Sequence, residues 1–170
     1  LSGGEALEGL NVAGSEINSN LIIIVNDNEQ SIAEVHGGMY KNLAELRETG
    51  GTASNNLFKA FGLDYIYEEN GNDIASLISL FRKVKDTDHP IVVHIHTQKG
   101  KGYEIAEKDK EGWHWCMPFD RETGKPTISF GDGEDYTSIT AEYIMQKAKS
   151  DSEFLVITPA MPGSAGLNQE

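Results

Sequence analysis

The sequence predicts an α/β fold in which a doubly wound, mostly parallel sheet carries helices on both faces. The first observation is a set of short apolar runs, rich in β-branched residues, at 21–25, 91–96 and 154–158. Such runs are typical of buried strands in parallel sheets. The second observation is that apolar residues recur at helical spacing between these runs. Strands that alternate with helices form parallel sheets covered on both sides.

The first part of the chain is expected to contain three helices and two strands. In chain order these are a helix at 4–13, a strand at 21–25, a loop at 27–38, helices at 39–47 and 55–61, and a strand at 64–67. Gly50 and Gly62 stop the last two helices, because glycine readily adopts the left-handed conformation found at helix ends. Ser54 is predicted to cap the helix at 55–61, since its hydroxyl can accept unpaired N–H groups of the first turn.

The second part begins with the clearest helix of the chain, capped by Asn72 or Asp73. Its apolar face consists of Ile74, Leu77, Ile78, Leu80 and Phe81. Basic residues fill its last turn, as the helix dipole favours. The later elements are a strand at 91–96, a Gly-, Pro- and charge-rich stretch at 99–135, a helix at 136–148 and a strand at 154–158. The length of the stretch at 99–135 indicates a functional loop or an interdomain linker.

The composition excludes several classes of protein. The 170 residues include 27 acidic and 14 basic ones, which gives a net charge of −13. This balance opposes binding to nucleic-acid backbones and to anionic membranes. One cysteine, Cys116, leaves no internal disulfide framework, and no apolar run has the length that a membrane span needs. We therefore expect a soluble, cytoplasmic protein with neither nucleic acid nor membrane as a partner.

Asn26-Asp27-Asn28 is the first cluster that could carry chemistry, because it directly follows the apolar run 21–25. Ligands of open α/β sheets bind at the carboxyl ends of strands. Side-chain oxygens beside a phosphate-bearing cofactor suit a hard cation such as Mg²⁺. Asn and Asp also end strands simply because they tolerate tight turns, and spacing alone leaves both interpretations open.

Two further clusters come after the strand at 91–96. Lys99-Gly100-Lys101-Gly102-Tyr103 offers glycines that allow close backbone approach and lysines that can pair with phosphate, although a solvated basic turn explains it equally well. His114 lies in an aromatic loop that ends in Pro118-Phe119-Asp120. A histidine can transfer protons near neutral pH, but a histidine in such a loop can also be structural.

Taken in order, these clusters resemble the thiamin diphosphate motifs of transketolase-like enzymes, and most closely the 1-deoxy-D-xylulose-5-phosphate synthase family. The segment 26–32 is similar to the second half of that family's metal and diphosphate motif. The segment 1–11 is similar to the stretch that comes directly after the first half, so the metal-binding aspartate would lie upstream of Leu1 in a longer protein. The chain departs from many members after Gly38, where they carry a long insertion.

The resemblance implies a role for each of five residues. Asn28 would bind Mg²⁺ through its side-chain oxygen, and thereby the cofactor. Gln30, where the family usually has methionine, would bind Mg²⁺ through its backbone carbonyl. Lys99 would lie near the diphosphate and Tyr103 would contact the cofactor. His114 would be the catalytic residue in the active site.

The resemblance also implies the activity, the cofactors and the partners. The parent enzyme would be a homodimeric transferase that uses thiamin diphosphate and Mg²⁺ to condense pyruvate with glyceraldehyde 3-phosphate, at the entry to isoprene and thiamine biosynthesis. Residues 1–125 would belong to the diphosphate-binding domain, and residues 126–170 to a linker and the start of the pyrimidine-binding domain. We expect the isolated chain to be inactive. A transketolase, a split transketolase subunit and a catalytically silent binding module are the alternatives.

Two other patterns receive structural interpretations. His94 and His96 share one face of a strand and could form a metal pair, but no third ligand stands at a suitable spacing. Gly131-Asp132-Gly133 spells the first half of the cofactor motif, yet the next apolar run ends in Pro159-Ala160 instead of Asn-Asp-Asn. We interpret it as a turn.

Overall fold

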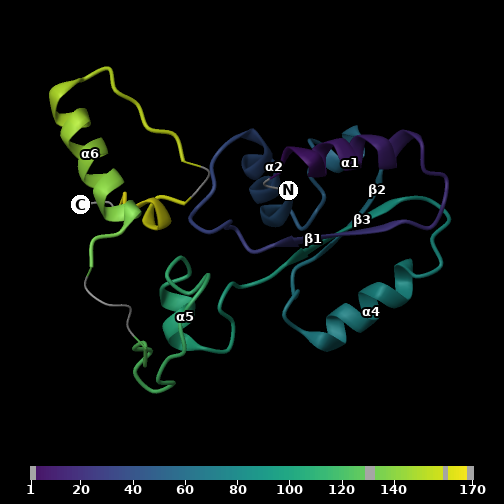
Figure 1. The fold of residues 1–170 in the computed structure, drawn as a ribbon. Helices are drawn as coiled ribbons and strands as arrows, with labels where there is room; N and C mark the ends of the chain where they lie inside the picture. Colours follow the sequence, from purple (N-terminus) through teal and green to yellow (C-terminus); the bar gives the residue numbers. More distant parts are fainter. Residues whose placement is uncertain (1–2, 129–132, 159–160, 168–170) are drawn as a thin grey trace.

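Three parallel strands form the sheet of this protein. The computed structural model describes residues 3–128, 133–158 and 161–167, and Figure 1 shows their path. The strands β1 (Ile22–Asp27), β2 (Asp64–Glu68) and β3 (Ile91–His96) lie in the order β1-β3-β2. Ile91 of β3 aligns with Ile22 of β1 and with Asp64 of β2. Because all three strands run in one direction, their carboxyl ends meet at one edge of the sheet.

Helices cover both faces of this sheet, as the sequence predicts. On one face lie α1 (Gly4–Ser15), α2 (Gly38–Glu48) and α3 (Leu57–Ala60). Their buried core consists of Leu10, Ala13, Val25, Leu43, Leu46, Phe58, Leu63 and Val92. On the other face, α4 (Ile74–Val84) packs Leu80 and Val84 against Val93. Adjacent residues of β3 thus serve opposite faces, and Figure 1 shows α4 across the sheet from α1 and α2.

The helix starts show where local side chains decide the boundaries. Asp73 caps α4 by accepting the N–H of Ser76 at 2.7 Å, which confirms one of the two predicted caps. The predicted Ser54 cap is wrong. Asn56 caps α3, because its side-chain oxygen accepts the N–H groups of Phe58 and Lys59 at 3.0 and 3.2 Å. Ser54 lies too far upstream to reach them.

The stretch at 99–135 contains more structure than a loop. The short helix α5 (Glu104–Lys108) begins directly after Tyr103. Three rings then form what we call the aromatic cluster, Tyr103, Trp113 and Phe119, with centroid separations of 4.5 to 5.7 Å. Helix α6 (Tyr136–Ser150) begins at a capping box in which Asp135 and Ser138 exchange hydrogen bonds.

The predicted strand at 154–158 is wrong. These residues form no regular element, and Leu155 and Ile157 are 79 % and 87 % exposed. A strand needs a hydrogen-bonded neighbour, and the ladders found within the described residues join only β1, β2 and β3. The 3-10 helix η1 (Gly163–Ala165) comes next and contacts α6. Gly131 and Asp132 of the predicted turn lie outside the described residues, and the domain boundary at 125–126 stays a prediction.

None of the helices is suited to crossing a membrane. Across residues 3–128, 133–158 and 161–167, no helix is both long enough and apolar enough to do so.

Candidate functional site

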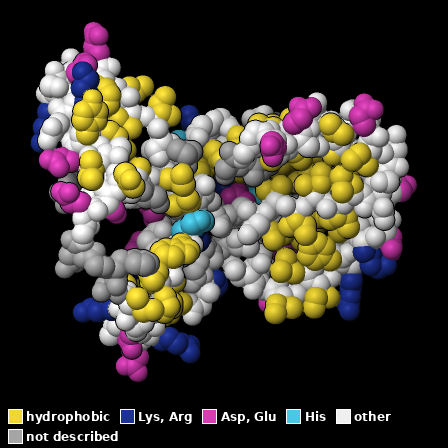
Figure 2. All heavy atoms as spheres, viewed as in Figure 1, with side chains coloured by type: hydrophobic (Ala, Val, Ile, Leu, Met, Phe, Trp, Pro, Cys, Tyr) yellow, Lys and Arg dark blue, Asp and Glu magenta, His cyan; other side chains and the backbone are white. Residues whose placement is uncertain are grey.

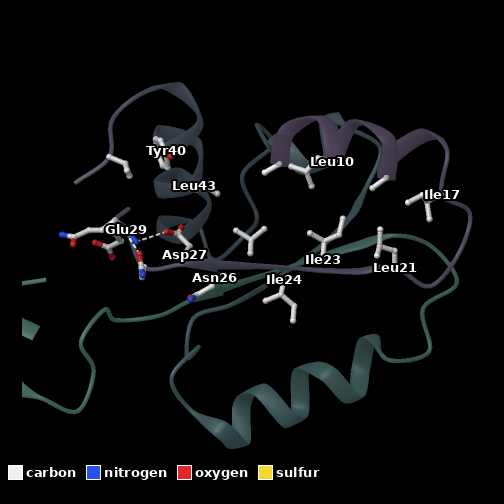
Figure 3. Close-up of a pocket in the computed structure, with 17 residues that line it drawn as sticks. Leu10, Ile17, Leu21, Ile23, Ile24, Asn26, Asp27, Glu29, Tyr40 and Leu43 are labelled. Atoms are coloured by element: carbon white, nitrogen blue, oxygen red, sulfur yellow. Dashed lines mark hydrogen bonds between the residues drawn. The ribbon is translucent and has the colours of Figure 1, made fainter. Parts of the chain in front are cut away.

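The candidate site lies at the carboxyl end of β1, which ends in Asn26 and Asp27 (Figure 3). Asn28 is the next residue along the chain. Asn26 Oδ1 accepts the hydroxyl of Thr97 at 2.6 Å, which ties this end to the segment after β3. Asn28 Oδ1 accepts the N–H of Gln30 at 3.1 Å. That hydrogen bond occupies one of the two lone pairs of the amide oxygen, so the other can still serve a ligand.

Asp27 is buried and turns away from solvent into a network of charged groups. The Arg47 guanidinium donates to Asp27 Oδ2 at 2.5 Å, and His94 Nε2 lies 3.0 Å from the same oxygen. Burial opposes the charge and raises the pKa of Asp27, but hydrogen bonds from His94, Glu29 and Arg47 outweigh it and lower the pKa to about 2. Asp27 is therefore a carboxylate at neutral pH.

The network continues behind His94. This side chain has no exposed surface, and its Nδ1 lies 2.7 Å from the Tyr65 hydroxyl. Burial and the nearby charge of Asp27 raise the pKa of Tyr65, so its hydroxyl stays neutral. Sequence reasoning missed this network, because Arg47, Tyr65 and His94 come from three separate elements. The one available signal was a histidine, His94, within the apolar part of the predicted strand at 91–96.

Glu29 has an unusual backbone conformation, with φ at +67°. This left-handed region disfavours residues that carry a Cβ atom. Its N–H donates to Asp27 Oδ1 at 3.0 Å, and its carboxylate accepts from His96 Nε2 at 2.8 Å. His96 Nδ1 also lies 3.2 Å from Glu69 Oε1. His94 and His96 thus contact different carboxylates, His94 that of Asp27 and His96 those of Glu29 and Glu69.

Gln30 carries a buried acceptor that no described residue satisfies. Its Oε1 is shielded from solvent and lacks a hydrogen-bond partner among the residues that the structure describes. An unpaired buried polar atom destabilises a protein unless a bound group pairs with it. Gln30 also lines two neighbouring cavities. This atom therefore favours a ligand that brings a donor or a cation to the turn.

The larger of these cavities runs from α1 along β1 to the turn and has a volume of about 420 Å³. Figure 3 shows its apolar part, with Leu10 and Ile23 among the lining side chains, and its polar end at Asn26, Asp27 and Glu29. Figure 2 shows apolar side chains gathered along β1 between α1 and α4, and Ile24 there is 54 % exposed. An apolar channel with a polar end suits an organic ligand that carries a charged group.

Lys99 links the two loops that flank the site. Its ammonium group donates to the backbone carbonyls of Ser31 and Ile32 at 2.9 and 3.0 Å. Burial lowers the pKa of Lys99, while the charge of Glu111 acts in the opposite direction. Lys99 therefore fixes the segment that comes after Gln30. Its predicted place beside a diphosphate stays a prediction.

The other predicted residues lie in the segment after β3. Tyr103 stands in the aromatic cluster, and its hydroxyl donates to the Arg121 carbonyl at 3.1 Å. His114 is exposed, and its backbone N–H donates to the Glu111 carbonyl at 3.0 Å. Their roles toward a cofactor and in catalysis stay predictions. Within the described ranges, no group of three or more His, Cys, Asp or Glu side chains could hold a metal ion.

Comparison with known proteins gives one consistent result. A family model described as 1-deoxy-D-xylulose-5-phosphate synthase matches residues 1–54 and 49–97. A protein of that name from Geobacter metallireducens is 34 % identical over 203 residues, which cover 98 % of this chain and 32 % of the relative. One from Listeria monocytogenes is 35 % identical over 176 residues, which cover 99 % of this chain and 29 % of the relative. One from Yersinia pseudotuberculosis is 32 % identical over 199 residues, which cover 98 % of this chain and 32 % of the relative.

The chain is much shorter than the relatives that it matches. The chain spans about a third of each of these curated relatives. The alignment with the Geobacter protein covers 203 residues, more than the 170 of this chain, so that relative carries segments that this chain lacks. The alignment with the Listeria protein covers only 176 residues. The expected place of this difference, after Gly38, stays a prediction. The matched names favour the synthase over a transketolase.

Proposed function

Because the chain belongs to the 1-deoxy-D-xylulose-5-phosphate synthase family, we propose that it forms part of a thiamin diphosphate- and Mg²⁺-dependent transferase. The whole protein would condense pyruvate with glyceraldehyde 3-phosphate and so supply a precursor of isoprenoids. The observation that carries this proposal is the turn after β1, where Asn28 and Gln30 stand at the polar end of an apolar cavity. In α/β sheets, cofactors bind at this edge.

The donor atoms of the turn fit a hard cation. Mg²⁺ prefers oxygen ligands, and the amide oxygen of Asn28 and the backbone carbonyl of Gln30 are such groups. Gln30 Oε1, which has no partner among the described residues, adds a further acceptor on the same residue. Mg²⁺ is usually completed by carboxylates, phosphates and water. As the family resemblance implies, the cofactor's diphosphate and an aspartate N-terminal to Leu1 would supply further oxygen ligands.

The chain's own residues would bind the metal, hold the loop beside it and transfer a proton. Asn28 and Gln30 would hold the metal, and Lys99 would keep the loop after Gln30 in place through the two carbonyls it binds. Tyr103, which is fixed in the aromatic cluster, would contact the cofactor from the segment that comes after β3. When bound, thiamin diphosphate supplies the electron sink for decarboxylation of a 2-oxo acid. His114, whose side chain is exposed, would transfer a proton at its imidazole ring.

Assembly and location also belong to this proposal. The family resemblance supports a cytoplasmic homodimer, and sedimentation of the full-length protein tests the dimer. The isolated chain would not turn over substrate, because none of its residues is assigned to activating the cofactor's aminopyrimidine ring. Turnover of pyruvate by the 170-residue chain alone would contradict this expectation.

Calorimetry on the full-length protein tests the metal assignment. Asn28→Ala should weaken Mg²⁺-dependent binding of thiamin diphosphate on the order of tenfold or more, as loss of an interaction in a metal site does. Asn18→Ala is the matched control, because Asn18 is exposed and lies before β1, at the opposite end of the strand. Equal affinity in both variants would refute the role of Asn28. Consumption of pyruvate together with glyceraldehyde 3-phosphate would separate the synthase from a transketolase.

A further inference from the structure

The turn from Asp27 to Gln30 is held in a conformation that its own sequence does not favour. Glu29 has φ at +67° and is the one residue other than glycine with positive φ in the described part of the chain. Strained backbone persists only where surrounding contacts enforce it, and such places are common at functional sites. Asn28 and Gln30 flank this residue directly, so its conformation sets how both present their oxygens.

Asp27 supplies the contacts that enforce the turn. Its Oδ1 accepts the Glu29 N–H at 3.0 Å, while its Oδ2 accepts from Arg47 and lies 3.0 Å from His94 Nε2. Both oxygens are therefore engaged within the protein, and only 5 % of the side chain is exposed. A carboxylate used in this way has little capacity left for a metal ion, although Asp27 is the one acidic residue of the Asn-Asp-Asn segment.

The groups that hold Asp27 come from the sheet and from one of the helices that cover it. Arg47 belongs to α2, and His94 lies in the centre of β3. Tyr65 of β2 holds the far side of the His94 ring, 2.7 Å from Nδ1. The turn is thus connected through the Asp27 side chain to α2 and to β3, and through His94 to β2 beyond it. Charge-assisted hydrogen bonds of this kind are short and directional, which suits a rigid support.

We propose that Asp27, Arg47 and His94 are positioning residues that lock the strained turn and so preorganise Asn28 and Gln30 for the metal ion. This inference rests on the proposed function and assigns Asp27 a supporting role in place of a ligand role. Partners behind metal ligands commonly control affinity nearly as strongly as the ligands themselves, because they fix ligand orientation. Such a network keeps the turn assembled before the metal and the cofactor arrive.

The first experiment removes the contacts of Asp27 with Arg47 and His94 in the full-length protein. Asp27→Asn keeps an oxygen for the Glu29 N–H but presents an amide where Arg47 and His94 need an acceptor. Mg²⁺-dependent binding of thiamin diphosphate, measured by calorimetry at a temperature where the variant is folded, should weaken about 10- to 100-fold. Asp86→Asn is the matched control, because Asp86 is 81 % exposed in a surface ion pair with Lys85. Unchanged affinity in a folded Asp27→Asn protein would overturn the proposal.

The second experiment separates positioning from simple loss of stability. Glycine tolerates positive φ, so Glu29→Gly should let the turn form without its lock. The double variant Asp27→Asn/Glu29→Gly should recover part of the lost affinity, and Tyr65→Phe should lower the affinity less than Asp27→Asn does. A thermal midpoint that falls in all these variants, together with unaltered Mg²⁺ and cofactor affinity, would assign the network a purely structural role.

The outcomes also distinguish this inference from the proposed function. If the unaltered full-length protein shows no Mg²⁺-dependent binding of thiamin diphosphate, the proposed function fails. If the protein binds and Asn28→Ala weakens binding while Asp27→Asn does not, only the positioning role fails. Hydrogen exchange at the Glu29 and Gln30 amides gives a readout without any ligand, and Asp27→Asn should accelerate it.

Discussion

The turn after β1 and the segment from Tyr103 to Thr127 both carry predicted site residues, but they are held together by different forces. The turn is fixed by a buried carboxylate with Arg47 and His94 around it. The later segment, which we call the exit segment, relies on the aromatic cluster and on hydrogen bonds at the surface, and Ala106 is its one buried hydrophobic residue among those described. Segments with few buried contacts open at low free-energy cost. The metal end of the proposed site is thus rigid in this chain, whereas His114 stands on a segment that can adjust.

Two spectroscopic probes can monitor these regions separately. Both tryptophans, Trp113 and Trp115, lie in the exit segment, so fluorescence reports on it. Far-UV circular dichroism reports mainly on the sheet and its helices. We expect the fluorescence transition in urea to occur at a lower concentration than the dichroism transition. Coincident transitions would show that the two regions unfold as one unit.

The largest expected effect concerns the core beneath the turn. Phe58 has no exposed surface and stacks on Tyr65 at a centroid distance of 5.6 Å. Phe58→Ala should lower the free energy of unfolding by about 3–5 kcal/mol, because it removes buried apolar contacts and leaves a cavity. Urea unfolding monitored by circular dichroism measures this loss.

The exit segment offers the contrasting substitution. Trp113→Ala removes an even larger ring from the aromatic cluster, yet the dichroism midpoint should barely move. A shift as large as that of Phe58→Ala would mean that the exit segment supports the sheet, and the contrast between the two regions would fail.

The next effect depends on pH and arises from Asp27. Hydrogen bonds lower its pKa from 3.8 to about 2 in the folded protein. A group with a lowered folded pKa stabilises the protein fully above its unfolded pKa and loses that contribution as the pH falls through the folded value. Asp27 should therefore contribute on the order of 2 kcal/mol above pH ~4, lost between pH ~4 and pH ~2.

The Asp27→Asn variant isolates this contribution from those of other carboxylates. The gap in unfolding free energy between the unaltered protein and the variant should narrow as the pH falls from 5 to 2. The same measurement on Asp120→Asn, an exposed carboxylate of the exit segment, should show a much smaller change. A gap that stays constant with pH would show that Asp27 is not held as a buried anion.

The two regions also differ in how far the sequence predicts them. The strands predicted at 21–25 and 91–96 were found at 22–27 and 91–96, because each contains a short run of apolar, β-branched residues. The strand at 154–158 failed on the same signature, because a strand also requires a neighbour, which no local pattern reveals. The location of Asn28 and Gln30 at a strand end was predictable because the apolar run before them marks the strand. The network around Asp27 was not predictable, because Arg47 of α2, Tyr65 of β2 and His94 of β3 are far apart in the sequence and meet only in the folded chain.

A smaller effect is expected at the start of α3, which lies against the core. Asn56→Ala removes the oxygen that accepts the N–H groups of Phe58 and Lys59 and should cost about 1 kcal/mol of unfolding free energy. Asn56→Ser should cost less, since serine is also a strong cap and the buried Nδ2 of Asn56, which has no partner among the described residues, is removed. Equal losses for both substitutions, measured by urea unfolding, would show that the cap contributes little.

The smallest effect is expected for Tyr103→Phe, which forms a matched pair with Tyr65→Phe, one tyrosine in each region. Tyr65→Phe removes a hydroxyl that lies 2.7 Å from the buried His94 ring, and Tyr103→Phe removes one that donates to the Arg121 carbonyl at the surface. A buried polar partner left unpaired costs about 1–3 kcal/mol, whereas an exposed one is paired again by water, so Tyr103→Phe should cost at most about 0.5 kcal/mol. Dichroism should detect the first loss, and only tryptophan fluorescence should register the second, because the Trp113 ring packs against Tyr103 at 5.0 Å. If Tyr103→Phe instead shifted the dichroism midpoint as far as Tyr65→Phe, the exit segment would be as tightly coupled to the sheet as the turn itself, and His114 would stand on a rigid support after all.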